Sequence, residues 1–208
     1  MLKIAVIDYG MGNLKSVTNA INYLGYEVYI SNKANELEKA NALILPGVGS
    51  FGQAMENLKK LELDKVIRFL SLDQEVPILG ICLGMQILGN DSNEGGLNKG
   101  LGLIPGHVRK IPEKDNYRLP HIGWNSIKIL SEKPIYENIS SESSFYFVHS
   151  YRFECDQEFI SSSTEYSSRI VSSIQKNNIF GVQFHPEKSH KNGLILLKNF
   201  INHVALKA

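Results

Sequence analysis

The sequence lacks any strong imbalance of charge and any long apolar run. Its 208 residues include 22 Lys and Arg and 21 Asp and Glu, so the net charge at pH 7 is only +1. Such a chain has no electrostatic field that would attract nucleic acid or an anionic lipid surface. No stretch approaches the ~18 apolar residues that a membrane-spanning helix needs. We therefore expect neither nucleic acid nor a membrane as a partner.

Cysteine is also scarce, with only Cys82 and Cys155 present. The apolar start of the chain is interrupted at Asp8, and no small-residue cleavage site follows, so no signal peptide is predicted. A lone disulfide is poorly motivated without secretion, and the expected location is cytoplasmic. Cys155 lies in a polar segment that we expect to be exposed, and we assign it no role.

The sequence also lacks the patterns that hold metals and nucleotides. Its six histidines show no metal-binding spacing such as HExxH, so no metal is expected. Gly10-Met11-Gly12 follows an apolar run, as in a dinucleotide fingerprint, but Lys15 occupies the place of the third glycine. We therefore predict no cofactor.

Short β-type runs alternate with amphipathic segments through the first half of the chain. The β-branched and apolar runs predict buried strands, and apolar residues at helical spacing predict helices between them. This order indicates a mostly parallel sheet with helices on both faces, whose ligand site lies at the C-terminal ends of the strands. The predicted strands are 3–8, 27–31, 42–45 and 77–81, and the predicted helices are 13–24, 54–72 and one opening at 85–88.

The second half is richer in polar and turn residues, with a closing helix at 193–204. The predicted strands there are 126–130, 145–151, 158–163, 169–175 and 179–184. They suggest an antiparallel extension of the same sheet or a small sheet beside it. With 43% hydrophobic residues and no clear linker, the chain is expected to form one α/β, flavodoxin-like domain over residues 1–208.

The sharpest local pattern is Gly80-Ile81-Cys82-Leu83-Gly84, between a predicted strand and a predicted helix. Glycines on either side allow a tight turn that exposes a nucleophile. A thiol at a helix start is near free N–H groups, which favour thiolate and can stabilise an oxyanion. Taken alone, this pattern is equally typical of a buried cysteine packed among glycines.

A second pattern makes the catalytic interpretation stronger. Gly181 to Glu187 reads GVQFHPE, with His185 and Glu187 two residues apart at a predicted strand end. In extended chain such side chains share a face, so Glu187 can orient His185. His185 would then take the proton of Cys82 and later give it to a leaving group.

A third pattern, Pro46-Gly47-Val48-Gly49, ends the predicted third strand. A backbone N–H there is a candidate oxyanion donor. An ordinary turn has the same composition.

Together GICLGMQ, PGVGSFG and GVQFHPEKS resemble the class I, triad-type glutamine amidotransferases. The segments DYGMGNL, GLGLIPGHV, PHIGWN and YFVHSY narrow the resemblance to the glutaminase subunit of imidazole glycerol phosphate synthase. It extends from residue 4 to about residue 200. It implies a chain that hydrolyses L-glutamine through a cysteinyl thioester. The ammonia would pass to a (β/α)₈-barrel cyclase subunit in a heterodimer that makes imidazole glycerol phosphate and AICAR in histidine biosynthesis.

The resemblance also assigns roles. It implies a Cys82, His185 and Glu187 triad, with oxyanion N–H groups from Val48 and Leu83. The residues it implies for glutamine binding are Gly49, Gln86, Glu94, Ser150 and Tyr151, of which Glu94 or Gln86 supplies acceptors for the ammonium group. On weaker grounds, Asn13, Trp124, Asn125, Tyr136 and Lys188 are expected toward the partner.

Three alternatives remain open from the sequence. The first is a paralogous glutaminase that feeds ammonia to a surface-polysaccharide sugar amidotransferase. The triad does not distinguish it from a histidine-pathway subunit, because both need the same chemistry. The unusually polar stretch 88–99 also leaves this alternative open. The second is a subunit that only binds a partner, against which the complete Cys, His and Glu set argues. The third is a cysteine hydrolase of another substrate, such as a peptidase or γ-glutamyl hydrolase.

Overall fold

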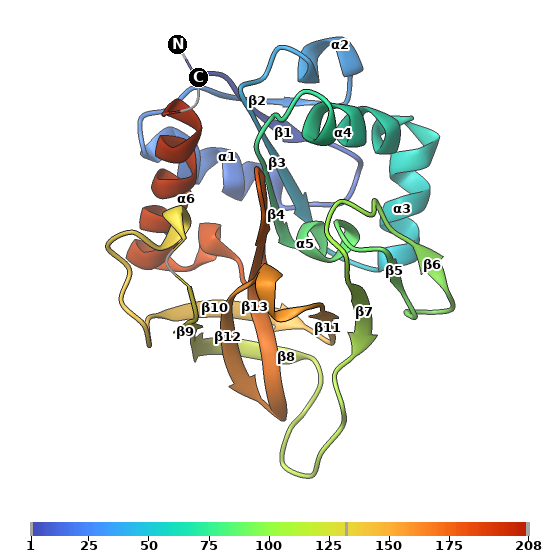
Figure 1. Ribbon diagram of the computed structural model, residues 1–208, viewed down its shortest axis with the longest axis vertical. Helices are drawn as coiled ribbons and strands as arrows, with labels where there is room; N and C mark the ends of the chain where they lie inside the picture. Colours follow the sequence, from blue (N-terminus) through green and yellow to red (C-terminus); the bar gives the residue numbers. More distant parts are fainter. Residues whose placement is uncertain (1, 132, 207–208) are drawn as a thin grey trace.

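The computed structural model describes residues 2–131 and 133–206. An eight-stranded sheet runs through it in the order β2-β1-β3-β4-β14-β13-β12-β9, and the first five of these strands are parallel (Figure 1). Their bounds are Val28–Ser31 (β2), Ile4–Ile7 (β1), Ala42–Gly47 (β3), Ile78–Cys82 (β4) and Ile179–Val182 (β14). The antiparallel strands that extend the sheet are β13 (Ser168–Lys176), β12 (Ile160–Tyr166) and β9 (Lys128–Ile129). The expected mostly parallel sheet with an antiparallel extension is therefore confirmed.

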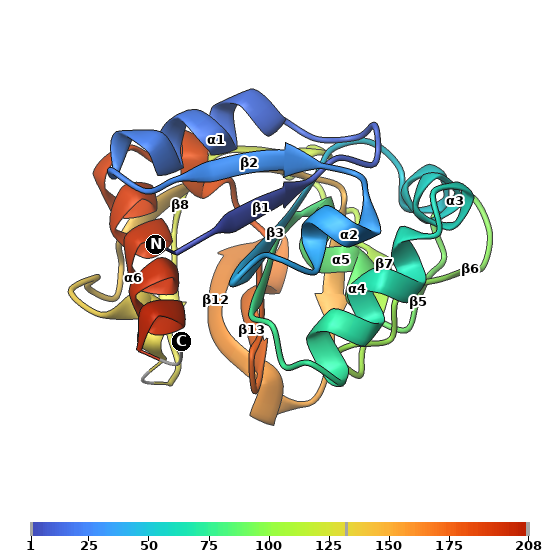
Figure 2. The same cartoon turned by 90° about the horizontal axis from the view of Figure 1, so that it is seen from above.

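Helices cover both faces of the parallel strands (Figure 2). One side carries α1 (Leu14–Tyr23) and α6 (His190–Ala205), whose apolar residues pack with one face of the strands. The other side carries α3 (Phe51–Lys60), α4 (Leu63–Leu72) and α5 (Leu83–Ile87). A short helix, α2 (Ala34–Leu37), follows β2. Because apolar residues face both layers, β1 and β3 are buried throughout.

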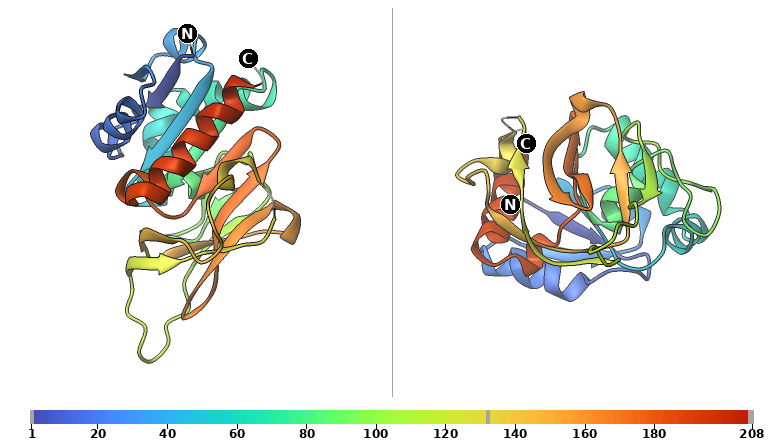
Figure 3. Two further views of the ribbon diagram at one scale, coloured as in Figure 1. Left: turned by 90° about the vertical axis from the view of Figure 1, so that its left-hand side faces the viewer. Right: turned by 90° about the horizontal axis from the view of Figure 1, so that it is seen from below.

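Two smaller sheets lie outside the eight-stranded sheet, toward the lower end and the right-hand side of the view in Figure 1, and Figure 3 shows them from two further sides. One pairs β8 (His121–Ser126) with β10 (Ser144–His149). The other has the order β11-β7-β5-β6, with bounds Tyr151–Glu154, His107–Lys110, Asp91–Ser92 and Asn98–Lys99. Three 3₁₀ turns are Pro134–Tyr136 (η1), Gln157–Phe159 (η2) and Pro186–Lys188 (η3).

Two predicted elements are broken in the structure. The helix expected over 54–72 is two helices, α3 and α4, because Glu62 between them adopts a left-handed backbone with φ of 56°. The strand expected over 145–151 ends at His149, and the chain joins a different sheet after Ser150. The second break places the backbone around Ser150 at the edge of the cavity described below.

Candidate active site

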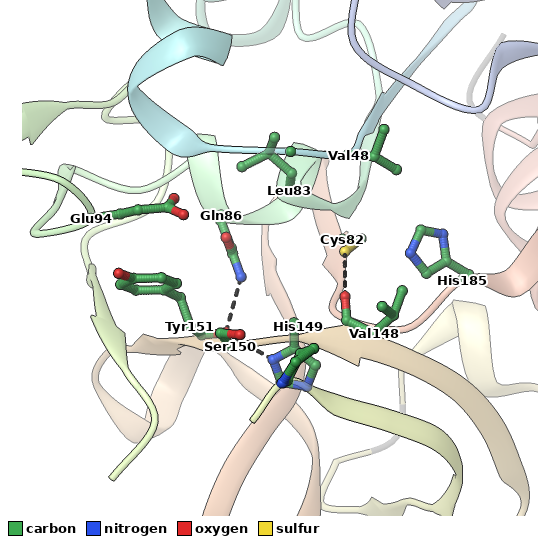
Figure 4. A pocket seen from close by; sticks show the side chains of 12 residues that line it. Val48, Cys82, Leu83, Gln86, Glu94, Val148, His149, Ser150, Tyr151 and His185 are labelled. Carbon is green, nitrogen blue, oxygen red and sulfur yellow. Dashed lines mark hydrogen bonds between the residues drawn. The ribbon is translucent and has the colours of Figure 1, made fainter. Parts of the chain in front are cut away.

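A cavity of about 280 Å³ lies at the C-terminal ends of β3 and β4, where a parallel sheet is expected to bind its ligand (Figure 4). The cavity brings together nine of the ten predicted site residues. They are Val48, Gly49, Cys82, Leu83, Gln86, Glu94, Ser150, Tyr151 and His185. The tenth, Glu187, is buried behind His185.

Cys82 lies at the junction of β4 and α5 in a strained backbone conformation, with φ of 55° and ψ of −111°. The strand and helix pack too closely here for side chains on the flanking glycines. A Cβ on Gly84 would overlap the carbonyl of Leu45, and a Cβ on Gly80 would lie 2.6 Å from the carbonyl oxygen of Gly84. The predicted tight turn is therefore present, and both glycines are required by packing.

Two polar neighbours hold the thiol of Cys82. It donates to the carbonyl oxygen of Val148 at 3.7 Å, and the side-chain amide of Gln183 donates to the sulfur at 3.7 Å. The helix after it, α5, has only five residues. The N–H of Leu83, the first residue of α5, is among those without a partner inside the helix. A negative charge at this turn would therefore be stabilised by these N–H groups rather than by the dipole of a long helix.

His185 and Glu187 are in contact, with 2.8 Å between Nδ1 and Oε1. Burial favours the neutral imidazole, but the nearby Cys82 sulfur and the Glu187 carboxylate outweigh it and raise the pKa of His185 to about 10. The other ring nitrogen, Nε2, is buried without a hydrogen-bond partner among the described residues. His185 faces the cavity that holds Cys82 (Figure 4), so Nε2 is the nitrogen available for proton transfer.

From the sequence, this contact was expected because alternate side chains of an extended strand share a face, and that reason was wrong. β14 ends at Val182, and Glu187 belongs to the 3₁₀ turn η3 rather than to an extended strand. The turn starts at Pro186 and folds the carboxylate back onto the ring of His185. Its geometry is fixed further by Ser189, whose hydroxyl donates to the carbonyl of His185 at 2.6 Å.

The predicted oxyanion residues lie on two sides of Cys82. Leu83 follows it directly, and Gly47, the residue before Val48, is the register partner of Cys82 across β3 and β4. Val48 is 42% exposed, so its side chain is packed less completely than the fully buried residues of β3 before it. Gly49 has φ of 104°, a conformation that favours glycine. This segment is therefore held less firmly than the turn at Cys82.

The predicted glutamine-binding residues line the opposite part of the cavity (Figure 4). Gln86 is buried, and its amide donates to the carbonyl of Tyr151 at 3.0 Å and to Gln183 at 2.9 Å. Its oxygen is thus the polar atom left for a ligand. Glu94 accepts the N–H of Phe51 at 2.7 Å through Oε2, which connects it to the first residue of α3.

Gln183 and His149 also belong to the site and were not predicted as site residues. Gln183 joins Gln86 to Cys82 through its side-chain amide. Its position two residues before His185 in GVQFHPE could have indicated that its side chain lies near the site. His149 lines the cavity and donates from Nδ1 to the carbonyl of Tyr151 at 2.8 Å. Its Nε2 lies 3.0 Å from Nδ1 of the buried His121, a pairing that no sequence spacing indicates.

Two further expectations were wrong. Tyr136 is buried, and its hydroxyl hydrogen-bonds to Ser162 at 2.8 Å and Ser173 at 2.7 Å, so it does not face a partner. Cys155 is partly buried against the core, and burial, with Asp156 nearby, raises the pKa of its thiol to about 12. The remaining residues expected toward a partner, Asn13, Trp124, Asn125 and Lys188, are exposed or half-buried.

No group of three or more His, Cys, Asp or Glu side chains that could hold a metal ion occurs within residues 2–131 and 133–206. In the same part of the chain, no helix is long and apolar enough to cross a membrane.

Comparisons with known proteins identify the family of the chain. The model of the glutamine amidotransferase class-I family matches residues 5–204. The chain is 48% identical over 198 residues to imidazole glycerol phosphate synthase subunit HisH 1 of Campylobacter jejuni, covering 95% of this chain and 98% of that protein. It is 49% identical over 198 residues to subunit HisH of Methanocaldococcus jannaschii, with the same coverage.

Among solved structures, a putative GMP synthase subunit from Thermoplasma acidophilum superimposes with a TM-score of 0.75. The match covers 100% of this chain and 96% of that one at 24% identity, and it therefore supports the fold alone. The family match and the close relatives place the chain more narrowly. The chain belongs to the class-I glutamine amidotransferase family and, within it, to the HisH subunits of imidazole glycerol phosphate synthase.

Proposed function

We propose that this chain hydrolyses L-glutamine to glutamate and ammonia and passes the ammonia to a cyclase subunit in histidine biosynthesis. The observation that carries the proposal is the position of Cys82 in a strained turn, beside a cavity that His185 faces with an unpaired Nε2. The names of the close relatives support the pathway, because they are described as subunits of imidazole glycerol phosphate synthase.

The proposed reaction starts at the Cys82 sulfur, which as thiolate attacks the side-chain amide carbon of glutamine. The carbonyl oxygen becomes an oxyanion, for which the N–H groups of Val48 and Leu83 are the proposed donors. His185, as imidazolium, gives its Nε2 proton to the leaving ammonia, and a γ-glutamyl thioester remains. Water then attacks the thioester while His185 takes a proton from it, and glutamate leaves with the thiolate restored.

The proposed roles of the other residues follow from their contacts. Glu187 keeps His185 oriented and favours its charged form through the 2.8 Å bond. The free oxygen atoms of Glu94 and Gln86 would accept the α-ammonium group of glutamine. Backbone groups at Gly49, Ser150 and Tyr151 would bind its carboxylate, because they line the same cavity.

The partner is proposed to be a (β/α)₈-barrel cyclase that forms a heterodimer with this chain and makes imidazole glycerol phosphate and AICAR. An exposed surface near the cavity suits docking. Trp124, 49% exposed, stacks on His190 at 4.9 Å, and Lys188 lies 5.9 Å above the ring of Tyr146. Ile122, on the same strand as Trp124, is 58% exposed. Exposed aromatic side chains such as that of Trp124 are enriched at protein interfaces.

We further propose that residues 1–208 form one domain and that the chain operates in the cytoplasm. The family model matches 5–204, which supports the first statement, although residues 1 and 208 lie outside the described part. Free thiols at Cys82 and Cys155 suit a reducing compartment, which supports the second.

The test is to purify the chain with the cyclase subunit encoded in the same genome and to measure glutamate release and imidazole glycerol phosphate formation from glutamine. The proposal predicts both activities, and complementation of a histidine auxotroph that lacks its own glutaminase subunit. Glutamate release with no imidazole glycerol phosphate would retain the glutaminase and reject the histidine pathway.

A further inference from the structure

The hydroxyl of Tyr9 is a buried polar group without a partner. The residue is 1% exposed, and its oxygen has no hydrogen-bond partner in the described part of the chain. Burial, and then the nearby sulfur of Cys82, raise the pKa of Tyr9 far above its usual value, so the group remains an O–H donor. Unpaired buried hydroxyls are uncommon, because the group loses hydrogen bonds to water and gains none in return.

Its position relates it to the proposed oxyanion segment. Tyr9 follows β1, which lies beside β3 in the sheet. A Cβ built on Gly47, the last residue of β3, would lie 2.5 Å from the Tyr9 hydroxyl oxygen. Glycine at position 47 therefore lets the hydroxyl approach the backbone that leads directly into Val48.

The geometry of the peptide between Gly47 and Val48 connects the hydroxyl to catalysis. In a trans peptide the carbonyl and the N–H point in opposite directions. β3 lies between β4, which carries Cys82, and β1, which leads to Tyr9. When the N–H of Val48 points toward an oxyanion above Cys82, the carbonyl of Gly47 therefore points away from that oxyanion, and the Tyr9 hydroxyl is a buried donor close to the same glycine.

We propose that Tyr9 is a positioning residue that stabilises the oxyanion-binding orientation of this peptide by donating a hydrogen bond to the carbonyl oxygen of Gly47. Among the described residues the hydroxyl has no hydrogen-bond partner, so it is not bonded to the carbonyl oxygen of Gly47 in this structure. Rotation of the peptide supplies the missing acceptor, and the gain in hydrogen bonding offsets strain in the rotated segment. The inference rests on the proposed function, since it acts through the N–H of Val48.

The test uses Tyr9→Phe, which removes only the hydroxyl, in the assembled complex with the cyclase and its ligand bound. We expect kcat for glutamine hydrolysis to fall about tenfold, equal to about 1.4 kcal/mol. KM for glutamine and synthesis from added ammonia should not change. The thermal midpoint of the free chain should stay the same or rise, because the hydroxyl that is lost was unpaired.

Tyr136→Phe is the matched control. Its hydroxyl is buried too, but it bonds to Ser162 and Ser173, and none of these three residues lines the cavity. This variant should lower the thermal midpoint and leave kcat unchanged. A fall in thermal midpoint for Tyr9→Phe as large as that for Tyr136→Phe would mean that the Tyr9 hydroxyl has a partner in the resting state, and would overturn the inference.

The rate of alkylation of Cys82 by iodoacetamide separates this role from a direct hydrogen bond to the sulfur. Tyr9→Phe should alkylate at the wild-type rate, and a change of the same size as that in kcat would place the hydroxyl on Cys82 and overturn the inference. A variant complex with the full wild-type kcat would also overturn it and leave the proposed function intact. A wild-type complex that releases no glutamate would reject both.

Discussion

Glu187 holds His185 by a single carboxylate oxygen, Oε1, which lies 2.8 Å from Nδ1, in a site where both side chains are at most 2% exposed. The second oxygen, Oε2, is buried and has no hydrogen-bond partner in the described residues. In the described residues the imidazole of His185 is the one hydrogen-bond partner of this carboxylate. Its contacts therefore support a role in orienting the ring and stabilising its protonated form. His185, by contrast, presents its free Nε2 toward the cavity.

Cys82→Ala should abolish glutamine hydrolysis and leave ammonia-dependent synthesis by the partner intact. The expected fall in glutaminase kcat is roughly 10⁴- to 10⁶-fold, because no other group can form the thioester. Glutamate release and product formation from ammonium chloride are measured on the same complex. Loss of the ammonia-dependent activity in a correctly assembled complex would contradict this division of labour.

His185→Ala should be nearly as damaging as Cys82→Ala, and Glu187→Ala less so, by roughly 10²- to 10⁴-fold. The reason is that His185 moves protons, whereas Glu187 acts through it. Glu187→Gln, which keeps the shape, is the matched control for packing. The Cys82→Ala, His185→Ala double variant should be little worse than either single one. A Glu187→Ala effect larger than that of His185→Ala would invert these roles.

Val48→Gly should raise glutamine hydrolysis in the absence of the partner's ligand. Turning the Val48 N–H inward puts strain on a β-branched residue, of about 1–3 kcal/mol, and glycine relieves it. The ratio of liganded to unliganded kcat should then shrink by roughly tenfold or more. Val48→Ala, which keeps a Cβ without branching, should fall in between. Because the side chain of Val48 is 42% exposed, neither variant disturbs the core. An unchanged ratio would show that strain at Val48 is not what limits the free chain.

The buried pair of His121 and His149 should make the fold sensitive to mild acid. Burial lowers the pKa of His121 to about 4 and, together with the nearby His121 and His185, lowers that of His149 to about 3. Both rings stay neutral in the fold below pH 6.5, while the unfolded chain binds protons. Stability is therefore present above pH 6.5 and is lost as the pH falls toward 4.

The measurement is the free energy of urea unfolding between pH 7 and pH 5, over which it should fall by at least about 1 kcal/mol. The raised pKa of His185 acts in the opposite direction, chiefly above pH 6.5, so it offsets part of the fall between pH 7 and pH 6.5 and little of it below pH 6.5. His121→Gln removes one of the two rings and should flatten the dependence. An equal slope in the variant would exclude His121 as its source.

Local sequence patterns were sufficient for the parallel strands and for the tight turn at Cys82. Buried strands such as β1 and β4 are short apolar runs, and glycines mark the turn at Cys82. Strand β8 was not predicted, because its pairing with β10 is set by residues about twenty positions away and its burial does not alternate. The prediction of a single helix over 54–72 was wrong, because Glu62 is not a residue type that favours the left-handed backbone it adopts.

Within the site, the pattern of residues identified which side chains meet but not how they meet. The contact of His185 with Glu187 was expected from strand alternation, yet a 3₁₀ turn makes it. The bonds that join Gln86, Gln183 and Cys82 depend on packing between α5 and β14, which no local pattern encodes.

The most direct test of the account follows the amide nitrogen of glutamine. The complex is given glutamine labelled with ¹⁵N in its side chain, an excess of unlabelled ammonium and the substrate of the cyclase, at a pH where little free ammonia is present. If Cys82 releases ammonia that passes to the partner, the ¹⁵N fraction of the imidazole glycerol phosphate should greatly exceed that of the bulk ammonium, and Cys82→Ala should remove the label entirely. A product that carries only the isotopic composition of the bulk, or label that persists in Cys82→Ala, would contradict the account.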